Sequence, residues 1–159
     1  MEESVRQFVE RMGLICEKEG MARSAGRLFA LLLMSDRPHS LDEIADELQV
    51  SKASASTNAR MLESLGFIER VAALGDRRDF YQVEHDPWER MLRVAQTRWR
   101  DMVAVFAEAQ ARLPDDRGVG RRRMGEAERF HRLLLEGSEA LIQEWRTLRE
   151  GAPGSDASK

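Results

Sequence analysis

Apolar side chains recur at three- and four-residue steps through most of this chain, which is the spacing of one face of an α-helix. Residues 3–19 follow this pattern and predict a first amphipathic helix that ends at Gly20. Residues 24–35 are apolar nearly all round and predict a second helix that is buried at the centre of a domain. Similar patterns begin after Asp86 and again over residues 121–150. The chain is therefore expected to be mainly helical.

Two serines mark the starts of two short helices in the middle of the chain. Ser40 is followed three residues later by Glu43, which together form the sequence signature of a capping box. The apolar spacing then predicts a helix over residues 41–48. Ser51 is the expected cap of a second helix over residues 52–65. The two helices are separated by so few residues that a helix-turn-helix is expected.

A β-hairpin is predicted directly after these helices. Gly66 ends the second helix, and residues 67–72 and 80–83 carry strand-like patterns. Residues 74–79 form the tip between them, whereas residues 36–39 are expected to be a loop. The predicted fold class is mainly α with a small β-wing (α+β), a winged helix-turn-helix flanked by N- and C-terminal helices.

Length and composition restrict the alternatives. The 159 residues suffice for one compact domain with dimerisation arms. A single cysteine excludes a disulfide framework and a cysteine-based zinc site within one chain. No apolar run reaches the roughly 18 residues that cross a bilayer, and the acidic start lacks the basic segment of a signal peptide. A cytoplasmic protein with no membrane partner is expected.

The net charge of −3 at first argues against a nucleic-acid partner. The acidic excess lies in residues 1–50, however, which carry ten acidic and six basic side chains. Residues 51–82 carry five basic and four acidic side chains, so the helix-turn-helix and hairpin are slightly positive. Local charge therefore permits DNA binding by this stretch.

The second short helix has two contrasting faces when it is turned at about 100° per residue. Ala55, Ala59 and Leu62 share the face expected to pack inward. The opposite face is small and polar and then basic, as expected of a helix in the major groove, and comprises Ala53, Ser56, Thr57, Arg60 and Ser64.

Specific contacts with double-stranded DNA follow from these positions. Ser51 and Lys52 are expected to meet phosphate at the helix start. Arg60 has the reach to fork onto a guanine edge, and Arg77 and Arg78 at the hairpin tip suit a narrow minor groove, with Asp76 orienting Arg78. The residues predicted to contact DNA are Ser51, Lys52, Ser54, Ser56, Thr57, Arg60, Arg77 and Arg78.

These motifs resemble those of MarR-type bacterial transcription regulators. The resemblance rests on the string Ser-Thr-Asn-Ala-Arg-Met-Leu at 56–62, on Gly-Phe-Ile-Glu-Arg at 66–70 and on Gly-Asp-Arg-Arg at 75–78. It extends over roughly residues 5–110 and is strongest to the branch that includes the glycine-betaine regulator and a mycobacterial repressor of an efflux pump. It implies a ligand-responsive homodimer that binds a pseudo-palindromic operator and represses transporter, efflux or stress-related genes.

Dimerisation in this family is implied to use the first and last helices. The expected divisions are residues 1–20 as an N-terminal dimerisation helix, 21–85 as the DNA-binding lobe, 86–150 as C-terminal dimerisation helices and 151–159 as a disordered tail. An apolar seam on the last helix has no obvious partner except another long helix. The residues predicted to dimerise are Phe8, Met12, Phe130, Leu134, Leu141 and Trp145.

The resemblance also implies an effector pocket between the DNA-binding lobe and the dimerisation helices. Its candidate lining is Phe29, Trp88, Met91, Leu92, Trp99 and Met102. Such a lining favours a small apolar or cationic effector, such as a quaternary ammonium compound. The alternative is that these side chains are ordinary core.

Other functions are weighed against this hypothesis. Cys16 is either a redox-sensing thiol or a small core residue, and its place on an apolar face favours the core. A winged helix that binds only other proteins would suit the acidic first 50 residues but not the two arginines at the hairpin tip. The three histidines are scattered and no catalytic arrangement is visible, so no metal, cofactor or enzyme activity is expected.

Overall fold

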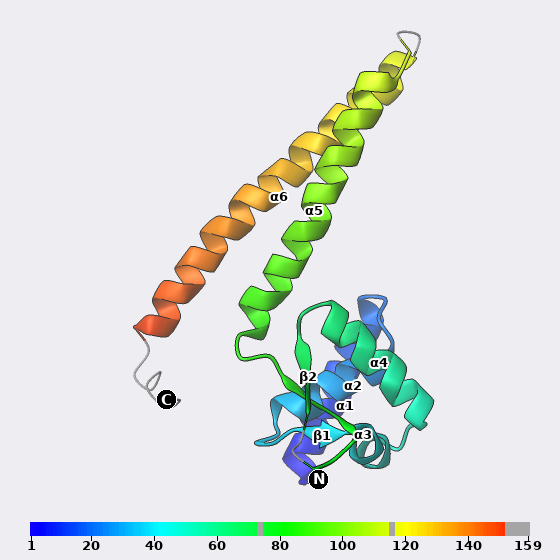
Figure 1. The fold of residues 1–159 in the computed structure, drawn as a ribbon, viewed down its shortest axis with the longest axis vertical. Coiled ribbons are helices and arrows are strands. Elements are labelled where there is room, and N and C mark those ends of the chain that lie inside the picture. Colours follow the sequence, from blue (N-terminus) through cyan, green and yellow to red (C-terminus); the bar gives the residue numbers. More distant parts are fainter. Residues whose placement is uncertain (73–74, 115–116, 152–159) are drawn as a thin grey trace. The chain divides into compact units, whose positions relative to one another are not determined.

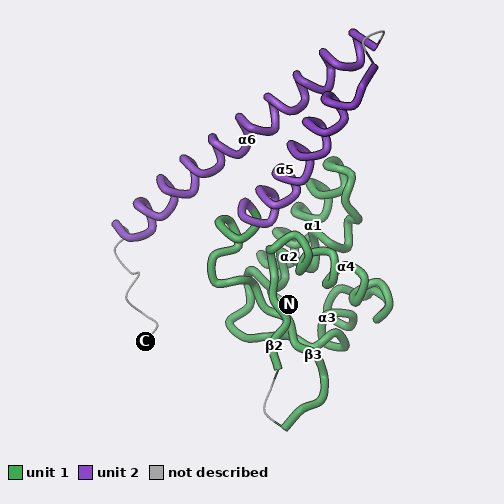
Figure 2. The backbone as a smooth tube through the Cα atoms, turned by 45° about the horizontal axis from the view of Figure 1, so that its top comes forward, with its two compact units in different colours: residues 1–91 green, residues 92–159 purple. Residues whose placement is uncertain are grey.

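The computed structural model describes residues 1–72, 75–114 and 117–151 and divides into two compact units, residues 1–91 and residues 92–159 (Figure 2). Gly151 is the last described residue, so the predicted disordered tail lies almost entirely outside the described residues.

The helices predicted over residues 3–19, 24–35, 41–48 and 52–65 all lie in the first unit, close to their predicted bounds (Figure 1). Helix α2 (Arg23–Leu33) is buried along most of its length, as its apolar surface predicts. The amphipathic helix α1 (Glu3–Lys18) packs along it. The two short helices α3 (Leu41–Leu48) and α4 (Lys52–Ser64) follow, and α4 also packs against α2. The core therefore surrounds α2, and Leu28 and Ile44 are among its fully buried side chains.

The first two helices approach closely because small residues lie at their contact. A Cβ atom placed on Gly26 would lie 2.6 Å from Sγ of Cys16 and 2.7 Å from the carbonyl oxygen of Met12. Both distances are shorter than van der Waals contact, so only glycine fits at this position of α2. The tight packing holds α1 in place on the unit that carries the helix-turn-helix.

A small antiparallel sheet completes the first unit. Strands β2 (Ile68–Ala72) and β3 (Asp79–Val83) pair in register from Ile68 with Val83 to Ala72 with Asp79, as the hairpin pattern predicts. A third strand, β1 (His39–Ser40), pairs with β3 through His39 and Tyr81, so the strand order is β1-β3-β2. The prediction of a loop at His39 is therefore wrong. Two residues are too few to show an alternating pattern, and their hydrogen bonds go to a strand 40 residues away.

The second unit contains most of α5 (Pro87–Arg112) and all of α6 (Gly118–Glu150). Asp86 caps α5 as predicted, since its Oδ1 accepts a hydrogen bond from the amide of Glu89. Helix α6 begins three residues earlier than its pattern indicates, because Gly118 and Gly120 adopt helical geometry. Because glycine has no side chain to contribute to an apolar pattern, the periodicity could not locate this start of the helix.

A polar layer joins the two long helices of the second unit. The buried Gln96 of α5 donates a hydrogen bond to Oγ of Ser138 of α6 at 3.0 Å. Beside it, Arg93 contacts the carboxylate of Glu139 at 2.6 Å. Ile142 of α6 is fully buried on the same side. Because these contacts are specific, they fix how the two helices align along each other. Among the described residues, no helix is long and apolar enough to cross a membrane.

Candidate nucleic-acid interface

The helix-turn-helix is positioned by two serine caps. Oγ of Ser40 accepts a hydrogen bond from the amide of Glu43, and the Glu43 carboxylate accepts one from the amide of Ser40 at 2.7 Å, which completes the predicted capping box. The Glu43 carboxylate accepts hydrogen bonds from the amide and the hydroxyl of Ser40 and from Arg37, and these hold the pKa of Glu43 at about 2. Oγ of Ser51 accepts a hydrogen bond from the amide of Ser54 and caps α4. Both predicted helix starts are thus confirmed.

The inner face of α4 anchors it to the core. Ala55, Ala59 and Leu62 are buried, as the helical projection predicts. Asn58 is buried on the same face, and its Nδ2 donates a hydrogen bond to Oγ of Ser24 on α2 at 2.8 Å. Asn58 is absent from the residues predicted to pack inward, although the same helical projection places it beside Ala55 and Ala59. Its hydrogen bond satisfies a polar group that would otherwise be costly to bury.

The outer face of α4 is open to solvent. Thr57 and Arg60 are exposed and Ser56 is half-buried, while Ala53 and Ser64 complete the exposed face. Nη2 of Arg60 donates a hydrogen bond to Oγ of Ser56 at 3.0 Å. The Arg60 side chain therefore lies along α4, and its guanidinium is held by a residue one helical turn earlier in the chain. This face matches the one predicted for DNA.

Two of the predicted contact residues already use their hydroxyl groups within the protein. Ser51 Oγ accepts the capping hydrogen bond, and Ser54 is half-buried, with its Oγ 3.3 Å from Nδ2 of Asn58. Lys52 is exposed but forms an ion pair in which its Nζ lies 2.7 Å from Oδ1 of Asp42 on α3. At the start of α4, the positive charge of Lys52 is therefore compensated by Asp42 although the side chain is exposed.

The hairpin tip holds its second arginine in a fixed orientation. Nη2 of Arg78 lies 2.6 Å from Oδ2 of Asp76, which also accepts from Nε, and the backbone amide of Arg78 donates to Oδ1 at 2.9 Å. The guanidinium lies 5.3 Å from the ring centre of Phe80, which is a cation–π distance. The hydrogen bond from Arg78 lowers the pKa of Asp76. The expected pairing of Asp76 with Arg78 is thus confirmed, and Arg77 beside them is exposed.

The residues predicted to line an effector pocket are divided between the two units. Phe29 and Trp88 belong to the first unit, where Phe29 packs at 5.1 Å from Phe67 and 6.0 Å from Trp88, measured between ring centres. Met91 ends this unit. Leu92, Trp99 and Met102 belong to the second unit. Phe29 and Trp88 are therefore part of an aromatic cluster, and a pocket formed by all six residues stays a prediction.

The residues predicted to dimerise differ in their exposure. Phe8 and Met12 are half-buried against the core of their own unit. On α6, Phe130 and Leu141 are exposed, whereas Leu134 and Trp145 are half-buried. Other large apolar side chains that the predicted dimerisation set leaves out are also exposed on α1 and α6, among them Leu14, Ile15 and Leu133. Dimerisation through any of these residues stays a prediction.

Cys16 has the environment of a core residue. Its side chain is 8% exposed at the contact of α1 with α2. Burial raises the pKa of its thiol, and the nearby Glu19 raises it further. A reactive thiol needs the opposite conditions, exposure and a lowered pKa. Within residues 1–72, 75–114 and 117–151, no cluster of three or more metal-ligating side chains occurs.

The capped helix pair, the exposed face of α4 and the arginine-tipped hairpin define a winged helix-turn-helix protein of the DNA-binding class. A model described as the MarR family matches residues 19–79. Over 127 residues, the chain is 38% identical to the HTH-type transcriptional regulator MmpR5 of Mycobacterium tuberculosis, in an alignment that covers 79% of this chain and 70% of that one. The chain belongs to the MarR family, as its motifs predict.

Two further similarities agree with this assignment. The chain is 33% identical over 98 residues to the HTH-type transcriptional repressor GbsR of Bacillus subtilis, covering 59% of this chain and 54% of the relative. A crystal structure described as a transcriptional regulator superposes with a TM-score of 0.83 at 29% identity, covering 91% of this chain and 99% of the other. These relatives are transcriptional regulators and not enzymes, and the chain is a MarR-family transcriptional regulator with a DNA-binding winged helix.

Proposed function

We propose that this chain is a homodimeric, ligand-responsive repressor that binds a pseudo-palindromic operator through α4 and the β2–β3 hairpin. The observation that carries the proposal is the exposed outer face of α4, where small side chains precede Arg60. Small residues allow a helix to lie deep in the major groove, and a long basic side chain then reaches a base edge.

The hairpin supplies a second contact of a different kind. Arg77 and Arg78 lie at its tip, and the clamp from Asp76 leaves Arg78 with few alternative orientations. Arginine is attracted to a narrow minor groove by its enhanced negative potential. Contacts in two grooves fix the register of one half-site, while Lys52 meets the phosphate backbone by exchanging Asp42 for a phosphate.

A homodimer is supported by the apolar surface of α6. Phe130 is 59% exposed, Leu133 is 65% exposed and Leu141 is 51% exposed, which is unusual for such large apolar side chains on one helix. A second copy of this chain would cover them in a two-fold interface, and a two-fold dimer presents two recognition helices to two half-sites about one DNA turn apart.

Repression and ligand response follow from family resemblance. The relative GbsR is described as a repressor, which supports the same sign of regulation here. The resemblance further suggests that the regulated genes encode transport, efflux or stress functions. A divergently transcribed transporter gene next to this one would support that assignment, and a neighbourhood without one would contradict it.

The experiment that tests the proposal begins with the selection of genomic DNA fragments on the purified protein. The selected site is then titrated by fluorescence anisotropy over a series of salt concentrations, and affinity is expected to fall steeply with salt. Arg60→Ala should cost about 1–3 kcal/mol and relax the preference for one base. Arg11→Ala, an exposed change on α1, is the matched control. Unchanged affinity and unchanged preference in Arg60→Ala would contradict the placement of α4 in the major groove.

A further inference from the structure

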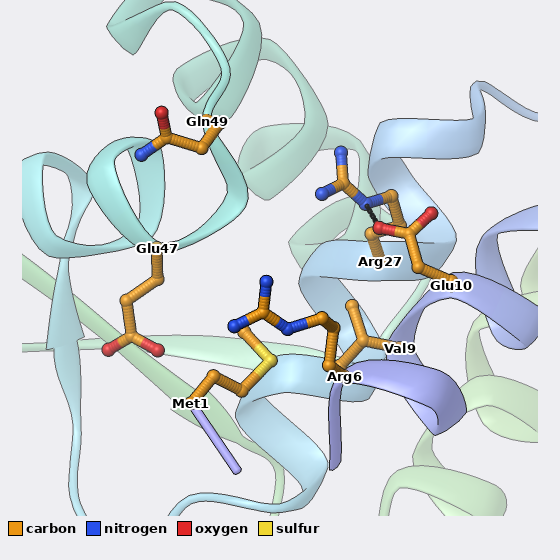
Figure 3. A pocket seen from close by; sticks show the side chains of 7 residues that line it. All are labelled: Met1, Arg6, Val9, Glu10, Arg27, Glu47 and Gln49. Carbon is orange, nitrogen blue, oxygen red and sulfur yellow. Dashed lines mark ion pairs between the residues drawn. The ribbon is translucent and has the colours of Figure 1, made fainter. Parts of the chain in front are cut away.

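A cavity of about 320 Å³ lies in the first unit, where α1, α2 and the end of α3 meet (Figure 3). Its lining includes none of the residues on the outer face of α4 and none of those predicted to line an effector pocket. Its volume is at the lower end of the range for small-molecule sites. Its lining combines one buried apolar side chain with charged groups of both signs and consists of Met1, Arg6, Val9, Glu10, Arg27, Glu47 and Gln49.

Two of the charged lining groups neutralise each other. Oε1 of Glu10 lies 2.8 Å from Nε of Arg27, the pair marked in Figure 3, and Oε2 lies 2.7 Å from Nη2 of Arg23. The hydrogen bond from Arg23 is the main cause that lowers the pKa of Glu10. Because both of its carboxylate oxygens face guanidinium groups, Glu10 has little capacity left for a ligand.

The remaining charges belong to different helices. Arg6 comes from α1, and among the residues with described positions its guanidinium has only a long contact to the exposed Glu3, at 3.8 Å. Glu47 comes from α3, and its Oε1 lies 3.4 Å from Nε2 of His39. The cavity therefore offers a cation from α1 and an anion from α3, with the apolar Val9 also in its lining.

Gln49 adds a strained residue to the lining. It lies at the end of α3 with φ of 52°, a left-handed conformation that glycine usually adopts. Among the residues that the structure describes, Gln49 is the only non-glycine residue with a positive φ. Its side-chain nitrogen donates to the carbonyl of Asp46, so the amide oxygen is left to accept a hydrogen bond.

From these observations we infer that the cavity binds a small zwitterion of the amino-acid type. Its carboxylate binds Arg6, its ammonium group binds Glu47, and a short apolar side chain lies against Val9. Such charge-assisted hydrogen bonds are stronger than neutral ones, so a ligand that carries both charges should bind more tightly than a ligand with only one.

The site would connect helix α1 to the helix-turn-helix. A ligand held by Arg6 and Glu47 bridges α1 to α3, and Gln49 lies in the turn that leads into α4. A regulatory role for this cavity rests on the ligand response that is part of the proposed function. Ligand binding itself does not depend on that proposal, because it is measured without DNA.

The test uses the full chain and isothermal titration calorimetry. Leucine is the first probe, and glycine, β-alanine and 4-aminobutanoate vary the distance between the charged groups. The matched controls are 3-methylbutylamine, which lacks the carboxylate of leucine, and 4-methylpentanoate, which lacks its amine. At least one zwitterion is expected to bind, and each single-charge analogue of leucine is expected to bind about tenfold more weakly than leucine or not at all.

Variants identify the site. Arg6→Ala and Glu47→Gln should each weaken binding about tenfold. Arg11→Ala on the same helix should leave it unchanged. The inference is overturned if none of the four zwitterions binds, if 4-methylpentanoate binds as well as leucine, or if both site variants bind like the wild type. Absence of operator binding by a protein that still binds a zwitterion would instead overturn the proposed function.

Discussion

Asp42 and Lys52 join the first turns of two consecutive helices, since Nζ of Lys52 lies 2.7 Å from Oδ1 of Asp42. The carboxylate lies at the start of α3, where the helix dipole favours a negative charge. The ammonium group lies at the start of α4, where the dipole disfavours a positive charge. Asp42 therefore offsets the unfavourable interaction of the Lys52 ammonium with the α4 dipole, and a DNA phosphate in its place would do the same.

Removal of this carboxylate should strengthen DNA binding. In Asp42→Asn, Lys52 reaches a phosphate without first leaving an ion pair. Exposed pairs are worth about 0.2–1 kcal/mol, so the operator affinity should rise about 1.4- to 5-fold. Asp46→Asn removes the same charge from α3 and reports the general electrostatic effect. An equal rise in both variants, measured by anisotropy, would mean that the ion pair does not compete with DNA.

Arg78 should not be replaceable by lysine. Lysine keeps the positive charge but loses the forked contact with Asp76 and most of the stacking on Phe80. Arg78→Lys should therefore weaken operator binding by about 1 kcal/mol while the salt dependence stays nearly unchanged. Arg78→Ala should weaken binding further and reduce the slope of log K against log salt by about 0.9. Wild-type affinity in the lysine variant would show that only charge matters at the tip.

The capping box should make the first unit sensitive to acid. The pKa of Glu43 is about 2 in the folded protein, below its ordinary value of 4.5. Because the folded value is the lower one, the stabilisation is present above about pH 4.5 and is lost as the pH falls towards 2. In Glu43→Gln the side chain can still complete the capping box, but it no longer titrates.

Urea unfolding followed by circular dichroism measures this effect. The free energy of unfolding should fall more steeply with acid in the wild type than in Glu43→Gln over that range. Glu17→Gln, an exposed change on α1, should follow the wild-type profile. Parallel profiles for the wild type and Glu43→Gln would contradict a role for the ionised carboxylate.

The close packing of α1 on α2 predicts a cost for an added methyl group. Gly26→Ala should destabilise the protein by about 1–3 kcal/mol, because its methyl group would overlap Cys16 and the backbone of Met12. Gly137→Ala is the matched change in α6, where a Cβ would meet no described atom within 4 Å, and it should stabilise by up to about 1 kcal/mol. Chemical denaturation compares the two. Addition of Cys16→Ala should restore only part of the loss, since the Met12 carbonyl remains.

Local signals in the sequence predicted much of this fold. Ser40 and Ser51 mark helix starts because a cap acts through hydrogen bonds to amides three residues away, so its cause and effect are adjacent in the sequence. The two faces of α4 follow from its periodicity for the same reason. The strand at His39 was missed because its pairing with Tyr81 is not local.

The candidate site was predictable in position but not in its internal contacts. The sequence predicted Lys52 and Arg78 as DNA contacts, and both are exposed, yet it gave no sign that Asp42 would neutralise Lys52 from the preceding helix. It also treated Ser54 as a contact to DNA, while its hydroxyl lies beside Asn58. The cavity at Arg6 and Glu47 joins three helices, so no single periodic pattern describes it.

The two-residue strand β1 has a mechanical consequence. Ser40 pairs with Phe80 in the sheet and, through its side chain, caps α3. Ser40 thus links the hairpin to the first helix of the helix-turn-helix, beside the pairing of His39 with Tyr81. In the binding mode proposed above, this link helps to set the span between a major-groove contact of α4 and a minor-groove contact of the hairpin, so DNA of a different groove width would have to deform to make both contacts.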